Sequence, residues 1–264
     1  MAVRKGYVDV KDGQLHYREA GPESGVPIVF LHQTASSGAM WEQVISRLEK
    51  DYKIYALDTP GFGGSYDIDE LPAISYYTDV FMEALDNLGV GEFHLVGHHT
   101  GACMAVEMGA GWPDRVKTLS LFGPVQLTQA ERDEFSKHFS GPFTPKSDGS
   151  HLMQNWKYLD ELGVAGRVDL HHREVTDMLR AWKGRALTYD AVWKQDFPAF
   201  FRKCTCPCLI MAARDDVLYA YLPRAKEAHP DAEMVELKGA NFEPDLDPDG
   251  SATAIRNFLK KNGF

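Results

Sequence analysis

The chain is poor in cysteine and in positive charge. Only four of its 264 residues are cysteines, and three of them crowd into residues 203–208. Metal-binding cysteines usually form pairs with two residues between them, and no second pair of Cys or His is placed to complete such a site. We therefore expect neither a metal site nor a disulfide scaffold. Lys and Arg number 28 against 38 Asp and Glu, so the net charge is −10. Nucleic acids and anionic membrane surfaces are thus poor partners.

Long hydrophobic runs are missing as well. No stretch approaches 18 consecutive apolar residues, and the first ten residues contain no apolar signal-peptide core. The composition, with 44% hydrophobic and 25% charged residues, is that of an ordinary globular protein. We expect a cytoplasmic protein without a cofactor that acts on a small molecule. A homodimer is the one assembly that we consider.

Short apolar strands alternate with helical patterns along most of the chain. An amino-terminal hairpin is predicted around Asp12-Gly13, a favoured two-residue turn. Further strands are predicted at 27–32, 52–58, 92–97, 115–123, 206–213 and 232–239. Helices are predicted at 39–50, 75–89, 100–112, 221–229 and 251–261. This order predicts an α/β fold with a mostly parallel central sheet and helices on both faces. Ligands of such sheets bind beyond the carboxyl ends of the strands.

Residues 125–200 interrupt the alternation. This segment has helical patches and many aromatic side chains, among them Phe135, Phe139, Phe143, Trp156, Tyr158, Trp182, Trp193 and Phe197. We predict a helical cap that covers the carboxyl edge of the sheet and lines a pocket. Residues 1–124 and 201–264 then form the core domain.

The sequence Gly97-His98-His99-Thr100-Gly101 joins a predicted strand to a predicted helix. Small residues at both ends of such a pentapeptide permit a sharp turn in a crowded backbone, and this is the pattern of a nucleophile elbow. The turn presents its middle residue, here His99, at the top of the sheet.

With this motif the chain resembles the α/β-hydrolase superfamily. The resemblance extends over nearly all of the chain, through the segments 31–34, 58–65, 112–116, 213–215 and 239–242. It implies an α/β-hydrolase fold with an inserted cap. It also implies an acid at Asp215, a base position at Asn241, and an oxyanion hole formed by the backbone N–H groups of Thr34 and Thr100.

Two of the three triad positions differ from the family pattern. His99 replaces the usual Ser, Cys or Asp, and Asn241 replaces the usual His, so a serine-hydrolase mechanism is excluded. An imidazole with a pKa near 6.5 is mostly neutral at pH 7 and needs no separate base. We expect the His99 ring to reach the cap pocket, to contact Asp215 or Asn241, and to act as a nucleophile or a general base.

Other polar residues near these motifs are less strongly indicated as functional residues. His32 and Gln33 are candidate substrate-binding residues, and the Gln33 side chain either adds an oxyanion donor or packs against the cap. Asp216 is an alternative for the acid, and Glu243 is the other nearby carboxyl group. His98 is expected to point away from the pocket and to be structural.

Three functions remain open on this evidence. The first is hydrolysis of an ester, a lactone or a C–C bond in a small carbonyl compound, with His99 at the nucleophile position. The second is a cofactor-free lyase or proton-transfer reaction, with His99 as general base and the oxyanion hole holding an enolate. The third is a non-catalytic pseudo-hydrolase that only binds its ligand.

Overall fold

A computed structural model describes residues 3–141, 143–164 and 166–264. Eight strands form one sheet in the order β1-β2-β4-β3-β5-β6-β7-β8. The strands are β1 (Arg4–Val10), β2 (Gly13–Ala20), β3 (Ile28–Leu31), β4 (Ile54–Leu57), β5 (Phe93–His98), β6 (Val116–Phe122), β7 (Cys208–Ala213) and β8 (Glu233–Leu237). β2 runs antiparallel to β1 and to β4, and all other neighbours are parallel. The predicted mostly parallel sheet is confirmed.

The amino-terminal hairpin differs from the prediction by one residue. Val10 pairs with Gly13, so Lys11 and Asp12 form the two-residue turn instead of Asp12-Gly13. Gly13 belongs to β2, where a Cβ would collide with the ring of Tyr66 at 2.7 Å. Gly13 thus allows β2 to pack closely against Tyr66 and does not belong to the turn, so the predicted turn position is one residue too late.

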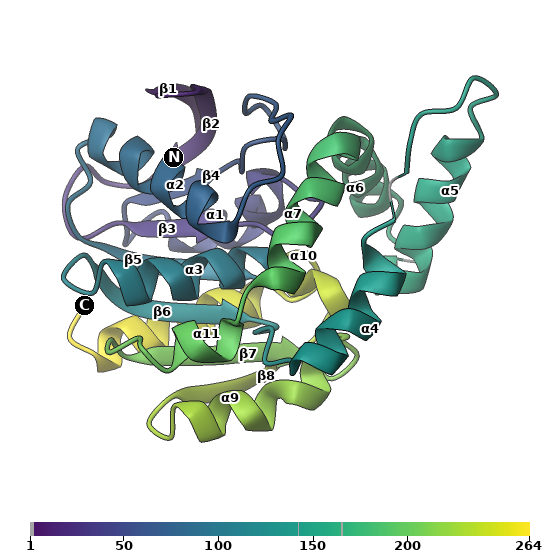
Figure 1. The fold of residues 1–264 in the computed structure, drawn as a ribbon. Coiled ribbons are helices and arrows are strands. Elements are labelled where there is room, and N and C mark those ends of the chain that lie inside the picture. The colour runs from purple at the N-terminus through teal and green to yellow at the C-terminus, as the bar shows by residue number, and fades with distance from the viewer. Residues whose placement is uncertain (1–2, 142, 165) are drawn as a thin grey trace.

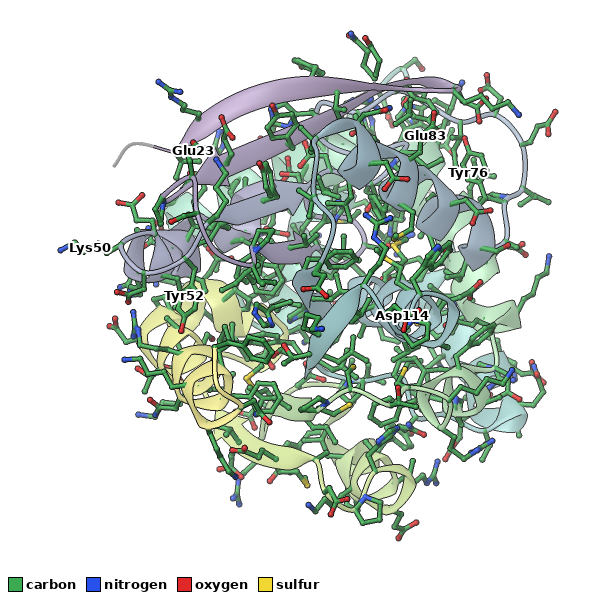
Figure 2. All side chains as sticks on the ribbon, turned by 90° about the vertical axis from the view of Figure 1, so that its left-hand side faces the viewer. Glu23, Lys50, Tyr52, Tyr76, Glu83 and Asp114 are labelled. Carbon is green, nitrogen blue, oxygen red and sulfur yellow. The ribbon has the colours of Figure 1, made fainter. Side chains whose placement is uncertain are left out.

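Helices cover both faces of the sheet. The core helices are η1 (Gly38–Trp41), α1 (Glu42–Leu48), α2 (Ile74–Asn87), α3 (Thr100–Gly111), η3 (Tyr219–Tyr221), α9 (Leu222–Ala228), η4 (Ala240–Phe242), α10 (Glu243–Leu246) and α11 (Pro248–Lys261). Alternate residues of the buried strand β3 face opposite layers. Val29 and Leu31 join the core under α2 and α3, whereas Ile28 and Phe30 join the core under α1 and α11. Side chains fill both layers (Figure 2).

The segment between β6 and β7 contains only helices and loops where the structure describes it. Its helices are α4 (Gln129–Phe139), α5 (Ser150–Leu159), the π-helix η2 (Asp160–Val164), α6 (Val168–Arg180), α7 (Trp182–Lys194) and α8 (Phe197–Phe201). In Figure 1 the helices α4 to α7 lie beyond the arrowheads of β5, β6 and β7. We refer to this helical segment between β6 and β7 as the cap. Within the described residues, no helix combines the length and the apolar character needed to cross a membrane.

Helix α6 joins the cap to the core through buried polar contacts. Ser36 donates a hydrogen bond to Glu174 at 2.6 Å, and Ser37 donates one to Asp177 at 2.8 Å. Arg173 forms a two-pronged ion pair with Asp245 at 2.6 Å. Burial and the neighbouring negative charge of Glu174 raise the pKa of Asp177 to about 7. Asp177 is thus a carboxyl group that loses its proton near neutral pH.

The raised pKa of Asp177 predicts a stability that falls with increasing pH. The unfolded chain releases this proton near pH 4, so the folded state is disfavoured progressively between about pH 4 and pH 7. We expect the stability of Asp177→Asn relative to the unchanged protein to be about 4 kcal/mol higher at pH 8 than at pH 4, because about three pKa units correspond to that free energy. Urea unfolding at both pH values measures the difference, with Asp169→Asn at an exposed site on α6 as control. A variant that is less stable at pH 8 would contradict this account.

Candidate active site

The sharp turn between β5 and α3 places His99 at the carboxyl end of the central strand. His99 has φ 46° and ψ −104°, a backbone conformation that a non-glycine residue rarely adopts. A Cβ on Gly97 would overlap the main chain at Gly101, and a Cβ on Gly101 would overlap the main chain at Leu31. The two glycines therefore allow the close approach that the turn requires. The structure thus has a sharp turn at His99 between β5 and α3.

The ring of His99 is held by Asp216. Nε2 of His99 lies 2.7 Å from Oδ2 of Asp216, whose side chain is fully enclosed. An ionised carboxylate accepts hydrogen bonds, so Asp216 favours the tautomer of His99 that carries its hydrogen on Nε2. A Cβ on Gly123 would overlap Cδ2 and Nε2 of His99, so this edge of the ring faces Gly123. Nδ1 lies on the other edge and makes no hydrogen bond within the described part of the chain.

The structure pairs His99 with Asp216 and not with Asp215. Asp215 was the expected partner of His99, but its side chain is exposed and Asp216 makes the contact. The N–H of Asp216 bonds to the carbonyl of Ala213 at 3.0 Å and closes a turn after β7. The last residue of this turn points back to the sheet, whereas Asp215 lies on its outer side. The sequence shows two adjacent acids, but it does not show which of the two side chains points toward His99.

Asn241 lies at the pocket wall but does not contact His99 through a hydrogen bond. Its Oδ1 accepts a hydrogen bond from the N–H of Val217 at 3.2 Å, and its Nδ2 donates one to the carbonyl of Leu162 at 2.9 Å. Asn241 thus joins the loop after β7 to the cap. The expected alternative contact of His99 with Asn241 is replaced by the contact with Asp216.

A small pocket opens at His99 between the core and the cap. The core contributes Gln33, Thr34, His99, Thr100, Val217, Leu218 and Asn241, and the cap contributes Val125, Phe135, Phe139, Tyr158, Leu162, Tyr189, Val192 and Trp193. Among the described lining residues, His99 is the one that can carry a positive charge.

The two residues expected to form an oxyanion hole both line this pocket. Thr100 is the first residue of α3, where backbone N–H groups have no acceptor within the helix. Thr34 follows β3, and its carbonyl accepts a hydrogen bond from the cap residue Tyr189 at 3.3 Å. Their N–H groups remain the predicted oxyanion donors.

Gln33 and His32 have different positions. Gln33 lines the pocket, and its Nε2 donates a hydrogen bond to the carbonyl of Asn241 at 3.0 Å. His32 is buried outside the pocket lining. One of its ring nitrogens contacts the carbonyl of Gln33 at 2.8 Å and the other accepts the N–H of Thr59 at 2.9 Å. Burial lowers the pKa of His32. Since both ring nitrogens contact backbone groups, His32 holds two loops together, and it is not among the residues that line the pocket.

Beneath the pocket floor, His98 contacts a second carboxyl group. Its Nε2 lies 2.9 Å from Oε2 of Glu243, and both side chains are fully enclosed. The rings of His98 and His99 are 4.3 Å apart. Ligand atoms of His98, His99 and Asp216 lie within 4.8 Å of one another, so this trio is the candidate metal-binding group among the described residues. The carboxylate contacts already use one nitrogen of each imidazole.

Sequence reasoning missed three features of the site. Gly123 leaves room for the His99 ring, but a single glycine after a strand gives no such signal. Tyr189 belongs to the pocket wall and was not among the aromatic residues noted in the cap. Arg185 is buried behind this wall, with its guanidinium 5.2 Å and 5.1 Å from the ring centres of Tyr158 and Tyr189. The guanidinium of Arg185 thus makes cation–π contacts with these two rings.

Comparisons with known proteins agree with this geometry. A family model described as "Alpha/beta hydrolase family" matches residues 28–250. An "Uncharacterized carboxylesterase nap" of Bacillus subtilis (strain 168) is 24% identical, with 89% of this chain and 79% of that protein covered. A 2-(acetamidomethylene)succinate hydrolase of Mesorhizobium japonicum is 27% identical, with coverages of 96% and 94%. The crystal structure of the enol-lactonase from Burkholderia xenovorans LB400 matches with a TM-score of 0.78 at 19% identity, covering 97% of this chain and 100% of that one.

Proposed function

The chain belongs to the alpha/beta hydrolase family, and we propose that it hydrolyses a neutral, apolar carbonyl compound with His99 as general base. The observation that carries this proposal is the pairing of His99 Nε2 with Asp216, because it leaves Nδ1 without a hydrogen-bond partner among the described residues while His99 lines an apolar pocket. No hydroxyl group stands at the middle position of the elbow, where His99 carries an imidazole instead. The relatives named above are hydrolases, which supports the reaction class.

The free nitrogen favours the activation of water over direct attack on a carbonyl. Nδ1 neighbours the ring carbon that bears the rest of the side chain, so it is sterically more hindered than Nε2. Removing a proton from water needs less room than forming a bond to a carbonyl carbon. As water attacks the carbonyl, its proton passes to Nδ1, and Asp216 stabilises the imidazolium that forms.

The remaining steps use groups that lie at the same pocket. The developing negative oxygen accepts hydrogen bonds from the N–H groups of Thr34 and Thr100. When the tetrahedral intermediate collapses, the bond to the leaving group breaks, and the proton on Nδ1 passes to that group. His99 returns to its neutral form. General base catalysis of this kind contributes about 10²- to 10⁴-fold to a rate.

The pocket lining favours a neutral substrate. None of the described residues that line the pocket is a Lys or an Arg, and the nearby Arg185 is turned toward the rings of Tyr158 and Tyr189. A carboxylate placed among aromatic side chains would lose its hydration without gaining a cation. The succinate-type substrate in the name of one relative is therefore a poor model for this chain.

A matched pair of esters tests this specificity. Phenyl butyrate and monophenyl succinate have acyl groups of similar length, but only the second carries a carboxylate. We expect kcat/KM to be at least about tenfold higher for phenyl butyrate, because burying the carboxylate costs more than 1.4 kcal/mol. Faster hydrolysis of monophenyl succinate would contradict the proposed substrate class.

A proton-transfer or lyase reaction is the second candidate, because a base with a free Nδ1 can also remove a proton from carbon. Product analysis separates the two functions. Hydrolysis in H₂¹⁸O puts one ¹⁸O atom into the acid product, whereas a lyase incorporates none.

A further inference from the structure

The loop after β3 is fixed by the core at both of its ends. At its start, the carbonyl of Gln33 contacts the ring of His32 at 2.8 Å. At its end, the N–H of Gly38 donates a hydrogen bond to Oδ1 of Asp58 at 2.7 Å. Asp58 is buried and directly follows β4. Residues 34–37 lie between these two contacts.

The middle of this loop is attached to the cap. Ser36 donates a hydrogen bond to Glu174 of α6 at 2.6 Å. The carbonyl of Thr34 accepts a hydrogen bond from the hydroxyl of Tyr189 on α7 at 3.3 Å. Ala35 joins an apolar cluster that is built largely from cap side chains. The conformation of the loop therefore depends on the cap as well as on the core.

Thr34 lies between two peptide groups with different anchors. The peptide group before it contains the Gln33 carbonyl and the Thr34 N–H, and His32 of the core holds it. The peptide group after it contains the Thr34 carbonyl, and Tyr189 of the cap holds it. A residue has only two soft backbone dihedrals, so these two contacts together define the orientation of the Thr34 N–H. Thr34 lines the pocket, and its N–H has no acceptor within the described part of the chain.

The side chain of Tyr189 is fixed by its neighbours in the cap. Its ring stacks on that of Trp193, with the ring planes 2° apart and the ring centres 5.5 Å apart. The guanidinium of Arg185 lies 5.1 Å from the centre of the same ring. Burial raises the pKa of Tyr189, so the hydroxyl keeps its proton at neutral pH. The hydroxyl has a single proton, and the bond to Thr34 uses it, so Tyr189 does not donate to a substrate at the same time.

We propose that Tyr189 is a positioning residue, through which the cap orients the N–H of Thr34 toward the substrate oxygen. The inference rests on the proposed function, in which Thr34 is one of two oxyanion donors. Tyr189 then affects the transition state more than the bound substrate, because negative charge appears on the oxygen only as the reaction proceeds. Removing an oxyanion donor costs about 10²- to 10³-fold in kcat, so a donor that is only less well oriented costs less.

The substitution Tyr189→Phe removes the hydroxyl and keeps the ring. We expect kcat for phenyl butyrate to fall about tenfold and KM to stay within about twofold, because the donor acts mainly in the transition state. Calorimetry should show about tenfold weaker binding of an aryl trifluoromethyl ketone, which forms a tetrahedral hydrate. The matched aryl methyl ketone does not hydrate, and its binding should be unchanged. A general loosening of the pocket would weaken the binding of both ketones.

The substitution Tyr77→Phe is the matched control. The hydroxyl of Tyr77 on α2 lies 2.7 Å from Oγ1 of Thr188, the residue before Tyr189 on α7. Tyr77 is not among the described residues that line the pocket. The control thus removes a buried contact between the core and α7 and leaves the contact of Thr34 intact. We expect kcat and KM of Tyr77→Phe to equal those of the unchanged protein within about twofold.

Amide NMR tests the positioning of Thr34 without any substrate. Tyr189→Phe should shift and broaden the N–H resonance of Thr34 and leave that of Thr100 unchanged, whereas Tyr77→Phe should alter neither. An unchanged Thr34 resonance, an unchanged kcat, or equal losses of kcat in Tyr189→Phe and Tyr77→Phe would overturn the inference. If the unchanged protein hydrolyses no ester, the proposed function fails, and the Thr34 resonance alone then decides whether Tyr189 positions this N–H.

Discussion

Replacing His99 by asparagine should lower kcat/KM for phenyl butyrate by about 10²- to 10⁴-fold, because the general base is lost. Asparagine tolerates positive φ better than most residues, so the variant should keep the elbow. Steady-state kinetics measures the loss, and circular dichroism verifies folding. His172→Asn, at an exposed position on α6, is the matched control and should retain full activity. Equal activity of His99→Asn and the unchanged protein would place the chemistry elsewhere.

The adjacent acids provide a second control for the same claim. Asp216→Asn should reduce kcat by a similar factor, because the amide no longer fixes the tautomer of His99 or stabilises its imidazolium. Asp215→Asn changes an exposed side chain one residue away and should leave kcat unchanged. The reverse result would restore the acid predicted from the sequence.

The double variant His99→Ser/Asn241→His should hydrolyse esters through a serine nucleophile. The substitutions place a hydroxyl at the elbow and an imidazole at the pocket position of Asn241, whose Oδ1 contacts the N–H of Val217, directly after Asp216. The members of a triad act as a unit, so the gain should be strongly non-additive. We expect p-nitrophenyl esters to be cleaved at least about 10²-fold faster by the double variant than by either single variant.

Covalent labelling tests the double variant independently of its kinetics. A fluorophosphonate should add to position 99 of the double variant and should leave the pocket of the unchanged protein unmodified, as intact mass and peptide mapping can show. Acyl chains of several lengths control for the fit to the cap. A folded double variant that neither reacts with the label nor exceeds the single variants would show that Asp216 or the oxyanion donors are misplaced.

The backbone geometry of the site could be predicted from the sequence because the motifs that determine it are short. The small residues at Gly97 and Gly101, the alternation of strands and helices, and the position of His99 all depend on short segments. The choice between Asp215 and Asp216 depends instead on how one turn closes. Strand alternation cannot decide it, because both residues lie beyond the end of β7.

The lower half of the site depends on contacts between distant segments. Glu243 was noted as a nearby acid, but its contact with His98 spans 145 residues of sequence. The helical pattern around Arg185 predicts a surface cation, yet this residue is buried and its guanidinium faces the rings of Tyr158 and Tyr189. Such packing follows from how distant segments fold against one another within the core and within the cap, and a local pattern of residue types does not predict it.

The central claim, that Nδ1 of His99 activates water against a carbonyl held by Thr34 and Thr100, is tested most directly by a crystal structure with an aryl trifluoromethyl ketone. This compound forms a hydrate that resembles the tetrahedral intermediate. We predict one hydrate oxygen about 3 Å from the N–H groups of Thr34 and Thr100, and the other about 3 Å from Nδ1 of His99. A bound ketone whose oxygens all lie more than about 4 Å from Nδ1 would contradict the account.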